Sequence, residues 1–237
     1  GYDRTAPTLH GENWLDFNAI QSGHSKPDQL SWAFVEADYA LEPVKPTLEM
    51  EPCYEDIAID FKVENGRFDA YDMRKQAYRP VFAGGFGHTY GHNSVWAWYL
   101  PTDVDGFGDV TDFWNMTWYE ALDRPGAAQM GHLRKLMESR PFVTRIPDQS
   151  LVKSDIGEGG AHIRATRCSD GSYAMIYIPD ANRQVTVDLT SINGESVRVW
   201  WFNPRTGTAE SPRTAGTTES DIVTGATATF ITPADGP

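Results

Sequence analysis

The chain has 237 residues, which is long enough for one large domain or for two modest domains with buried cores. Its net charge of -13 argues against nucleic acid as a partner, because binding to phosphates needs clustered lysine and arginine. Neutral or cationic ligands fit this composition better. Sites for sugars commonly combine carboxylates with aromatic faces, and the chain contains eight tryptophans.

The two cysteines, Cys53 and Cys168, lie far apart in the sequence and indicate neither a disulfide framework nor a metal-thiolate site. No apolar run reaches the length of a membrane-spanning helix, and no signal peptide opens the chain. Because the sequence begins at Gly1 instead of a methionine and ends abruptly at Pro237, we expect it to be a fragment of a longer protein.

The first 90 residues alternate between strand-like and helix-like patterns. In chain order, the expected elements are a strand at 14–21, a helix at 29–41, a strand at 45–50 and a helix at 68–82. Pro80 disfavours the last turn of the second helix. This alternation predicts an α/β barrel or a doubly wound sheet, in which ligands bind at the carboxyl ends of the strands. Those ends are expected at residues 21–24, 51–55 and 87–93.

A further helix is predicted at residues 126–139, and the pattern changes after Pro141. Short strand-like segments then follow one another closely, separated by turns that contain glycine. The predicted strands are 163–168, 172–178, 184–189, 196–202 and 226–231. Such spacing predicts an antiparallel β-sandwich, which is either complete or lacks its last strand. We place the boundary at residue 145, with an α/β domain at 1–145 and an all-β domain at 146–237.

The densest acidic cluster is residues 49–56, which hold four carboxylates in eight positions. Glycoside hydrolysis needs two carboxylates across the sugar, one to protonate the leaving oxygen and one to act as nucleophile or base. Glu51 is the best candidate, because it follows an apolar strand and precedes Pro52, which fixes the backbone. The alternative is that the acidic run is a solvated loop.

A glycine-rich segment at residues 84–93 contains groups that form hydrogen bonds while neutral, namely His88, Tyr90, His92 and Asn93. Sugar hydroxyls are suitable partners for them, and either Trp96 or Trp98 offers a face for stacking. The two histidines have the spacing of a helical zinc pair, but the glycines disfavour a helix and no glutamate adjoins the first histidine. Phosphate binding is disfavoured because the P-loop lysine is lacking. The remaining alternative is that these polar groups brace a tight turn.

Three sequence blocks carry a resemblance to a known family. WLDFNAIQSGH at 14–24, KPTLEMEPCYE at 45–55 and AGGFGHTYGHNSVW at 83–96 resemble the apiosidase-like glycoside hydrolases and occur in that family's order. VWWFNPRTG at 199–207 is similar to the domain that usually follows in this family and is named for collagen binding. The resemblance therefore extends over nearly the whole chain.

The resemblance implies a (β/α)8 barrel, in which residues 14–21, 45–50 and 84–90 correspond to the sixth, seventh and eighth strands and the first five strands are missing. Related barrel glycosidases place one carboxylate after strand four and the other after strand seven, and Glu51 matches the latter. Its partner is expected to be an aspartate before Gly1. We therefore expect that the full-length parent hydrolyses glycosides. The 237-residue chain alone is expected to be inactive, since one carboxylate cannot act both as the general acid and as the nucleophile or base.

In this interpretation Glu51 is the nucleophile or general base. Substrate contacts are assigned to Glu55, His24, His88, Tyr90, His92, Asn93 and Trp96, although a lone histidine at a strand end, such as His24, is often structural. No cofactor and no metal is expected. The expected substrate is a plant or microbial polysaccharide or oligosaccharide, and the resemblance implies a secreted, periplasmic or cell-surface protein.

The alternative function is that of a non-catalytic protein whose C-terminal β-sandwich binds a carbohydrate or a matrix protein. Nothing in residues 150–237 specifies collagen. Within this domain, side-chain alternation along a strand predicts that Trp200 and Trp201 are one core and one surface aromatic.

Overall fold

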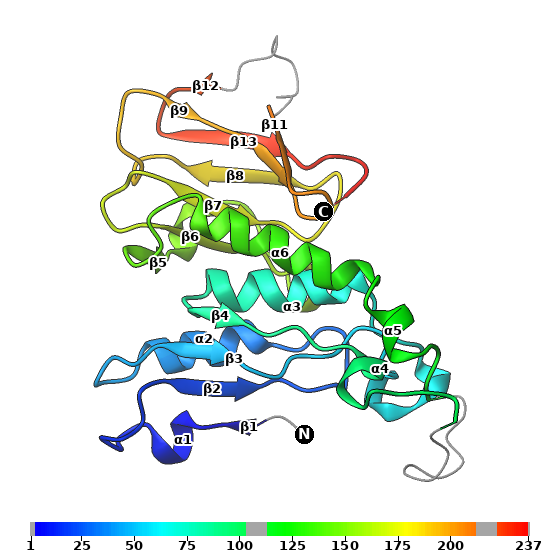
Figure 1. Cartoon of the computed structure of the whole chain (residues 1–237). Coiled ribbons are helices and arrows are strands. Elements are labelled where there is room, and N and C mark those ends of the chain that lie inside the picture. Colours follow the sequence, from blue (N-terminus) through cyan, green and yellow to red (C-terminus); the bar gives the residue numbers. More distant parts are fainter. Residues whose placement is uncertain (1–2, 103–112, 212–221, 237) are drawn as a thin grey trace. The chain divides into compact units, whose positions relative to one another are not determined.

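Two compact units make up the chain in the computed structural model, which describes residues 3–102, 113–211 and 222–236 (Figure 1). Unit 1 consists of residues 1–81 and 85–131, and unit 2 consists of residues 82–84 and 132–237. No helix in the described part of the chain is long and apolar enough to cross a membrane. The two units are described separately below.

Unit 1 contains a four-stranded sheet in the order β1-β2-β3-β4. Its strands are β1 (Asp3–Arg4), β2 (Asn18–Gln21), β3 (Thr47–Glu49) and β4 (Gly87–His88). The last three are parallel, whereas β1 is antiparallel to β2. The three strands predicted from sequence are therefore present, although each is shorter than predicted. Among the described residues this sheet does not close into a barrel.

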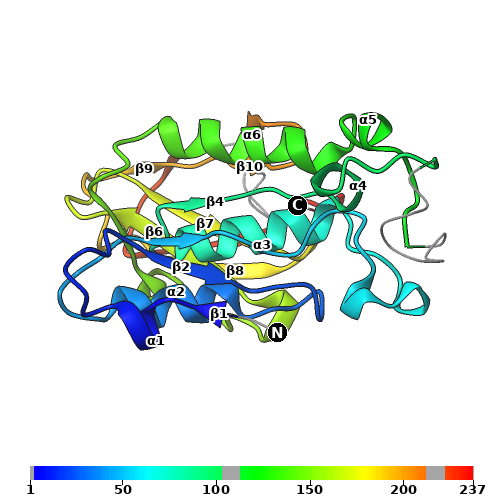
Figure 2. The same cartoon turned by 60° about the horizontal axis from the view of Figure 1, so that its bottom comes forward.

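One face of this sheet is covered by protein. On β2, Asn18 and Ile20 are buried, and on β3, Thr47 and Glu49 are buried, as the two-residue period of a strand requires. Helix α2 (Ser31–Tyr39), which connects β2 to β3, packs on both strands (Figure 2). Met50, which follows β3, is half exposed, whereas parallel sheets are usually covered on both faces.

The longer helices agree with the sequence pattern. Helix α3 (Ala70–Phe82) connects β3 to β4 and contains Pro80, and its last turn nevertheless forms. Helix α6 (Pro125–Glu138) begins with a proline, which is favoured at the first helical position because its missing N–H has no helical partner there. Sequence analysis did not predict the short elements α1 (Ala6–Leu9), α4 (Asn93–Trp96), α5 (Trp118–Ala121), η1 (Ile59–Phe61) and η2 (Val63–Asn65).

The described part of unit 2 forms four small antiparallel sheets. One sheet contains β5 (Arg145–Pro147), β6 (Arg164–Cys168) and β7 (Ala174–Tyr177). The pairs are β8 (Gln184–Asp188) with β13 (Thr227–Ile231), β9 (Val197–Arg198) with β12 (Ile222–Val223), and β10 (Trp201–Asn203) with β11 (Thr208–Glu210). The 3₁₀ turns η3 (Gln149–Leu151) and η4 (Gly159–Ala161) precede β6.

The core of unit 2 joins these sheets through apolar side chains, which include Leu151, Ile163, Val185 and Phe230. The predicted strand 196–202 is divided into β9 and β10 because its two halves pair with different partners, β12 and β11. Trp201 packs against the core, whereas Trp200 is 47% exposed, which confirms the predicted alternation. A sandwich of two continuous sheets stays a prediction.

Candidate active site

The parallel strands β2 and β3 end side by side, and the residues that follow them bring His24 close to Glu51. His24 Nε2 lies 3.6 Å from Glu51 Oε1. The backbone N–H of Tyr54 donates to His24 Nδ1 at 3.3 Å, so that in the neutral ring the proton is on Nε2, which faces the carboxylate. The backbone N–H of Gly23 donates to the Glu51 carbonyl at 3.2 Å. The ends of β2 and β3 therefore bring together His24 and Glu51, which were predicted separately from sequence.

Two side chains beside Glu51, those of His24 and Tyr54, are held uncharged. Burial lowers the pKa of His24, although the neighbouring Glu51 carboxylate acts to raise it. Burial also raises the pKa of the Tyr54 phenol to about 12, and the charge of Glu51 and a hydrogen bond to it contribute to that shift. The side chain of Glu51 itself is 39% exposed. This geometry leaves a carboxylate that is positioned by neutral groups and accessible from solvent.

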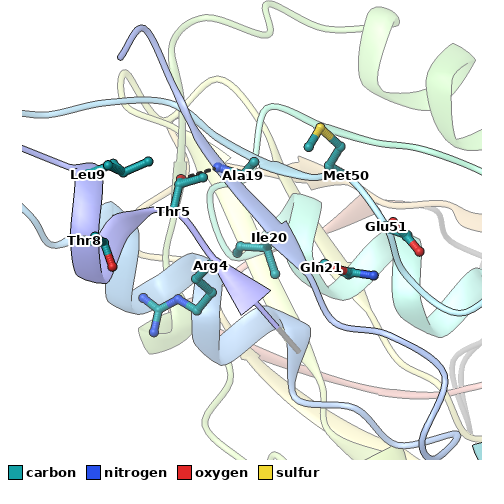
Figure 3. A pocket seen from close by; sticks show the side chains of 9 residues that line it. All are labelled: Arg4, Thr5, Thr8, Leu9, Ala19, Ile20, Gln21, Met50 and Glu51. Atoms are coloured by element: carbon teal, nitrogen blue, oxygen red, sulfur yellow. Dashed lines mark hydrogen bonds between the residues drawn. The ribbon is translucent and has the colours of Figure 1, made fainter. Parts of the chain in front are cut away.

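Glu51 also lines a pocket of about 410 Å³, a size suited to a small ligand (Figure 3). The Glu51 carboxylate and the Gln21 amide lie near the same end of this pocket. The lining residues are Arg4, Thr5, Thr8, Leu9, Ala19, Ile20, Gln21, Met50 and Glu51. A ligand in the pocket can therefore reach the carboxylate and an amide that both donates and accepts hydrogen bonds.

Glu49 is a buried acid that sequence analysis included in the acidic cluster but did not single out. Its side chain has no exposed surface, and its Oε1 accepts a hydrogen bond from the backbone N–H of Ser22 at 3.2 Å. Its Oε2 is buried and, among the described residues, has no partner with hydrogen-bond geometry. Burial raises the pKa of Glu49 to about 8, although the hydrogen bond from Ser22 acts to lower it. The carboxyl group is therefore mostly protonated at neutral pH.

Glu55 is buried in a different setting, at the start of α6. The backbone N–H of Gly126 donates to its Oε2 at 3.0 Å, and the Tyr90 hydroxyl donates to the same oxygen at 2.6 Å. The first backbone N–H groups of a helix have no helical acceptor, so a carboxylate there satisfies one of them and interacts favourably with the helix dipole. Glu55 thus connects the segment after β3 to Tyr90 and to α6.

His92 and Asn93 brace the segment that follows β4. Ser94 N–H donates to His92 Nδ1 at 3.0 Å, and His92 Nε2 lies 3.0 Å from Asp56 Oδ2. Burial alone would raise the pKa of Asp56, but the hydrogen bond from His92 and the charge of Arg124 lower it below its ordinary value. Asn93 donates from Nδ2 to the carbonyl of Phe113 at 2.8 Å. This geometry corresponds to the turn-bracing alternative weighed from sequence.

His88 and Trp96 are placed apart from these contacts. The imidazole of His88 has two buried nitrogens without a hydrogen-bond partner in the described part of the chain, although the residue as a whole is partly exposed. Burial lowers the pKa of His88 to about 3, so the ring is neutral. Trp96 is 48% exposed, and its ring centroid lies 5.6 Å from that of Trp114. Among the described residues no group of three or more His, Cys, Asp or Glu side chains could hold a metal ion.

Comparison with protein-family models gives two consecutive matches. Residues 2–144 match the model described as "Apiosidase-like, catalytic domain". The chain belongs to the apiosidase-like family. Residues 146–230 match the model described as "Putative collagen-binding domain of a collagenase". A comparison with curated proteins gives no match.

Two solved structures resemble this apiosidase-like chain over almost its full length. A protein described as a glycoside hydrolase has a TM-score of 0.85 and 34% sequence identity, with 99% of this chain and 53% of that chain covered. A glycoside hydrolase family 5 protein from Bacteroides vulgatus ATCC 8482 has a TM-score of 0.84 and 34% identity, with 97% and 49% covered. The apiosidase-like chain therefore spans about half the length of each.

The contact between Glu55 and α6 predicts an unusual effect of a glycine substitution. A Cβ at Gly126 would lie 2.8 Å from Glu55 Cδ and 3.0 Å from Tyr90 Cε2. We expect Gly126→Ala to destabilise the apiosidase-like chain by about 1–3 kcal/mol through overpacking, although alanine favours helices. Gly131→Ala in the same helix, where a Cβ meets nothing within 4 Å, is the control and should stabilise by about 0.5–1 kcal/mol. Urea unfolding measures both, and equal effects would contradict the close approach.

The protonation of Glu49 predicts a pH-dependent stability. The unfolded chain releases this proton near pH 4.5 and the folded chain near pH 8, so the stability falls as pH rises between these values and the slope disappears above pH 8. Glu49→Gln removes the titration, and its stability relative to wild type should rise by about 1.4 kcal/mol per pH unit within this window. Thermal unfolding from pH 4 to 9 measures the difference, with Glu64→Gln at an exposed position as control. Parallel curves for wild type and Glu49→Gln would refute a protonated Glu49.

Proposed function

We propose that these residues form part of the active site of a glycoside hydrolase and that Glu51 is one of its two catalytic carboxylates. The observation that carries the proposal is the position of Glu51 at the end of the middle parallel strand. There it lines a pocket, remains 39% exposed and lies 3.6 Å from a histidine whose Nε2 proton faces it. In α/β folds, ligands bind at this edge of the sheet.

In the proposed reaction, Glu51 acts as nucleophile or general base on the sugar. A carboxylate in either role must be ionised and must reach the anomeric carbon or a water molecule. The neutral His24 lies beside it, with Nε2 at 3.6 Å from the carboxylate, and orients the carboxylate without neutralising it. The second carboxylate, which protonates the leaving oxygen, is contributed by a residue outside these 237 residues, in keeping with the half coverage of both solved glycoside hydrolases.

The same proposal assigns the sheet to a (β/α)8 barrel. Strands β2, β3 and β4 are parallel and are connected by α2 and α3, which is the connectivity of such a barrel. The sheet face next to the half-exposed Met50 is then covered by the strands that complete the barrel. We further propose that unit 2 is a β-sandwich that accompanies the catalytic domain.

The predicted substrate contacts receive different roles in this proposal. His24 contacts both Glu51 and the sugar, and Trp96 offers an exposed face for stacking. Glu55, His92 and Asn93 are buried and shape the segments around the site. His88 on β4, whose ring nitrogens are buried, and Tyr90, which donates to Glu55, are assigned the same role. We propose a neutral plant or microbial polysaccharide as substrate, and a secreted or cell-surface location.

A second candidate function is binding of a carbohydrate or a matrix protein through unit 2 without catalysis. It is favoured by Trp200, whose exposed ring offers an apolar surface next to a β-strand. A glycan array probed with wild type and with Trp200→Ala tests it. Loss of a bound glycan in the variant supports this function, and identical binding contradicts a role of Trp200.

Amide substitutions of the two acidic candidates test the proposed catalytic residue. In the whole protein, Glu51→Gln should lower kcat by about 10²–10⁴-fold, because an amide is neither a nucleophile nor a base. Glu55→Gln should lower kcat by less than about tenfold, because its carboxyl group contacts Gly126 and Tyr90 rather than the pocket. Release of reducing sugar from plant and microbial polysaccharides measures both.

A larger loss for Glu55→Gln would overturn the choice of Glu51. The 237-residue chain expressed alone is the companion sample, and it should release no sugar because only one of the two carboxylates is present. Sugar release by that chain would contradict the proposal that the second catalytic carboxylate lies outside these 237 residues.

A further inference from the structure

Glu49 joins the segments that follow all three parallel strands. It is the last residue of β3, and its side-chain Oε1 accepts the backbone N–H of Ser22, the first residue after β2, at 3.2 Å. Its backbone carbonyl accepts the N–H of Thr89, the first residue after β4, at 3.1 Å. The Thr89 hydroxyl in turn donates to the carbonyl of Met50. One buried residue therefore contacts the chain beyond β2 and β4 as well as its own strand.

The segment that Glu49 holds on the β2 side is the one that holds Glu51. Ser22 is followed by Gly23, whose N–H donates to the Glu51 carbonyl at 3.2 Å, and by His24, whose Nε2 lies 3.6 Å from the Glu51 carboxylate. Movement of Ser22 would move both groups. Glu49 is therefore connected to the Glu51 carboxylate through Ser22 and His24.

We propose that Glu49 is a positioning residue for Glu51. The buried carboxyl group of Glu49 fixes the segment after β2 and thereby keeps His24 against the Glu51 carboxylate. This inference rests on the proposed function in so far as Glu51 is catalytic. Glu49 is not a catalytic residue, because it does not line the pocket and has no exposed surface.

Burial is the main cause that favours the uncharged form of Glu49. Glu51 lies two residues further along the chain and repels a negative charge on Glu49. Cys53 is buried nearby, and the charges of Glu49, Asp72 and Lys75 all affect the pKa of its thiol, the last two from α3. His88 is opposite Glu49 in the register of β4 and is neutral. Among the described residues Glu49 has no ion-pair partner, and protonation avoids an uncompensated buried charge.

Two substitutions separate the hydrogen-bond acceptor from the other properties of Glu49. Glu49→Leu removes the acceptor and leaves the Ser22 N–H unpaired, whereas Glu49→Gln keeps an acceptor oxygen at the same reach. In the whole protein at pH 6.5, we expect Glu49→Leu to lower kcat by about tenfold to a hundredfold, because small misplacements of a reacting group have effects of this size. Glu49→Gln should remain within about threefold of wild type, and KM should change little in either variant.

The titration of His24 provides a readout that does not need activity. Histidine labelled with ¹³C at Cε1 reports the pKa of His24, which is identified by its loss in His24→Gln. In Glu49→Leu the ring becomes less buried, so its pKa should rise towards the ordinary value, whereas in Glu49→Gln it should match wild type. If Glu49→Leu does not fold, Glu49→Asp, whose shorter side chain does not reach Ser22, takes its place.

The outcomes distinguish this inference from the proposed function. Equal kcat in wild type and Glu49→Leu, or an unchanged His24 titration in the folded Leu or Asp variant, would overturn the positioning role. An equal loss of kcat in Glu49→Gln and Glu49→Leu would also overturn it, because the acceptor is preserved in the former. If wild type hydrolyses no glycoside, the proposed function fails, while the His24 titration still decides whether Glu49 holds this segment.

Discussion

The register in which β3 pairs with β2 and β4 determines what the candidate site contains. Ile20 lies opposite Glu49 and Glu49 opposite His88, so the three strands end at the same level. The residues that follow them then meet at one edge. Side chains alternate along a strand, so a shift of β3 by one residue would exchange the buried Glu49 with the half-exposed Met50 and would turn Glu51 away from the pocket.

The acidic cluster illustrates how one short segment can accommodate carboxyl groups in different ways. Glu49 is protonated because burial raises its pKa to about 8. Glu55 is buried against the first N–H groups of α6, and Asp56 is paired with Arg124 and hydrogen-bonded to His92. Glu51 differs from these three in its exposure. Each buried acid has a local structural explanation, and Glu51 is the one in this cluster that lines the pocket.

The sequence was sufficient to predict the positions of β2, β3, α2, α3 and α6. It also predicted Glu51 at a strand end. It could not reveal that Glu55 contacts Gly126, since the two are separated by 71 positions and no local pattern joins them. The burial of Glu49 was likewise missed, although Thr47 and Glu49 alternate with Leu48 on β3 and therefore share one face of the strand.

The division of the chain into compact units is a tertiary feature, and the domain boundary at residue 145 stays a prediction. The composition changes near residue 145, whereas the compact units divide within α6 at residues 131 and 132, because the helix begins in one unit and ends in the other. The turn-bracing roles of His92 and Asn93 depend on Asp56 and Phe113, which come from other segments of the chain. Such contacts follow from the tertiary structure and leave no signal in the spacing of the residues themselves.

The most direct test of the catalytic assignment is a crystal structure of the whole protein, in which the distance from the Glu51 carboxyl group to the nearest carboxyl group outside these 237 residues is measured. A glycoside hydrolase requires a second carboxyl group across the same cavity, at about 5–5.5 Å for a retaining reaction or about 6.5–9.5 Å for an inverting one. We expect a distance within one of these ranges. A cavity at Glu51 with no second carboxyl group within about 10 Å would contradict the account.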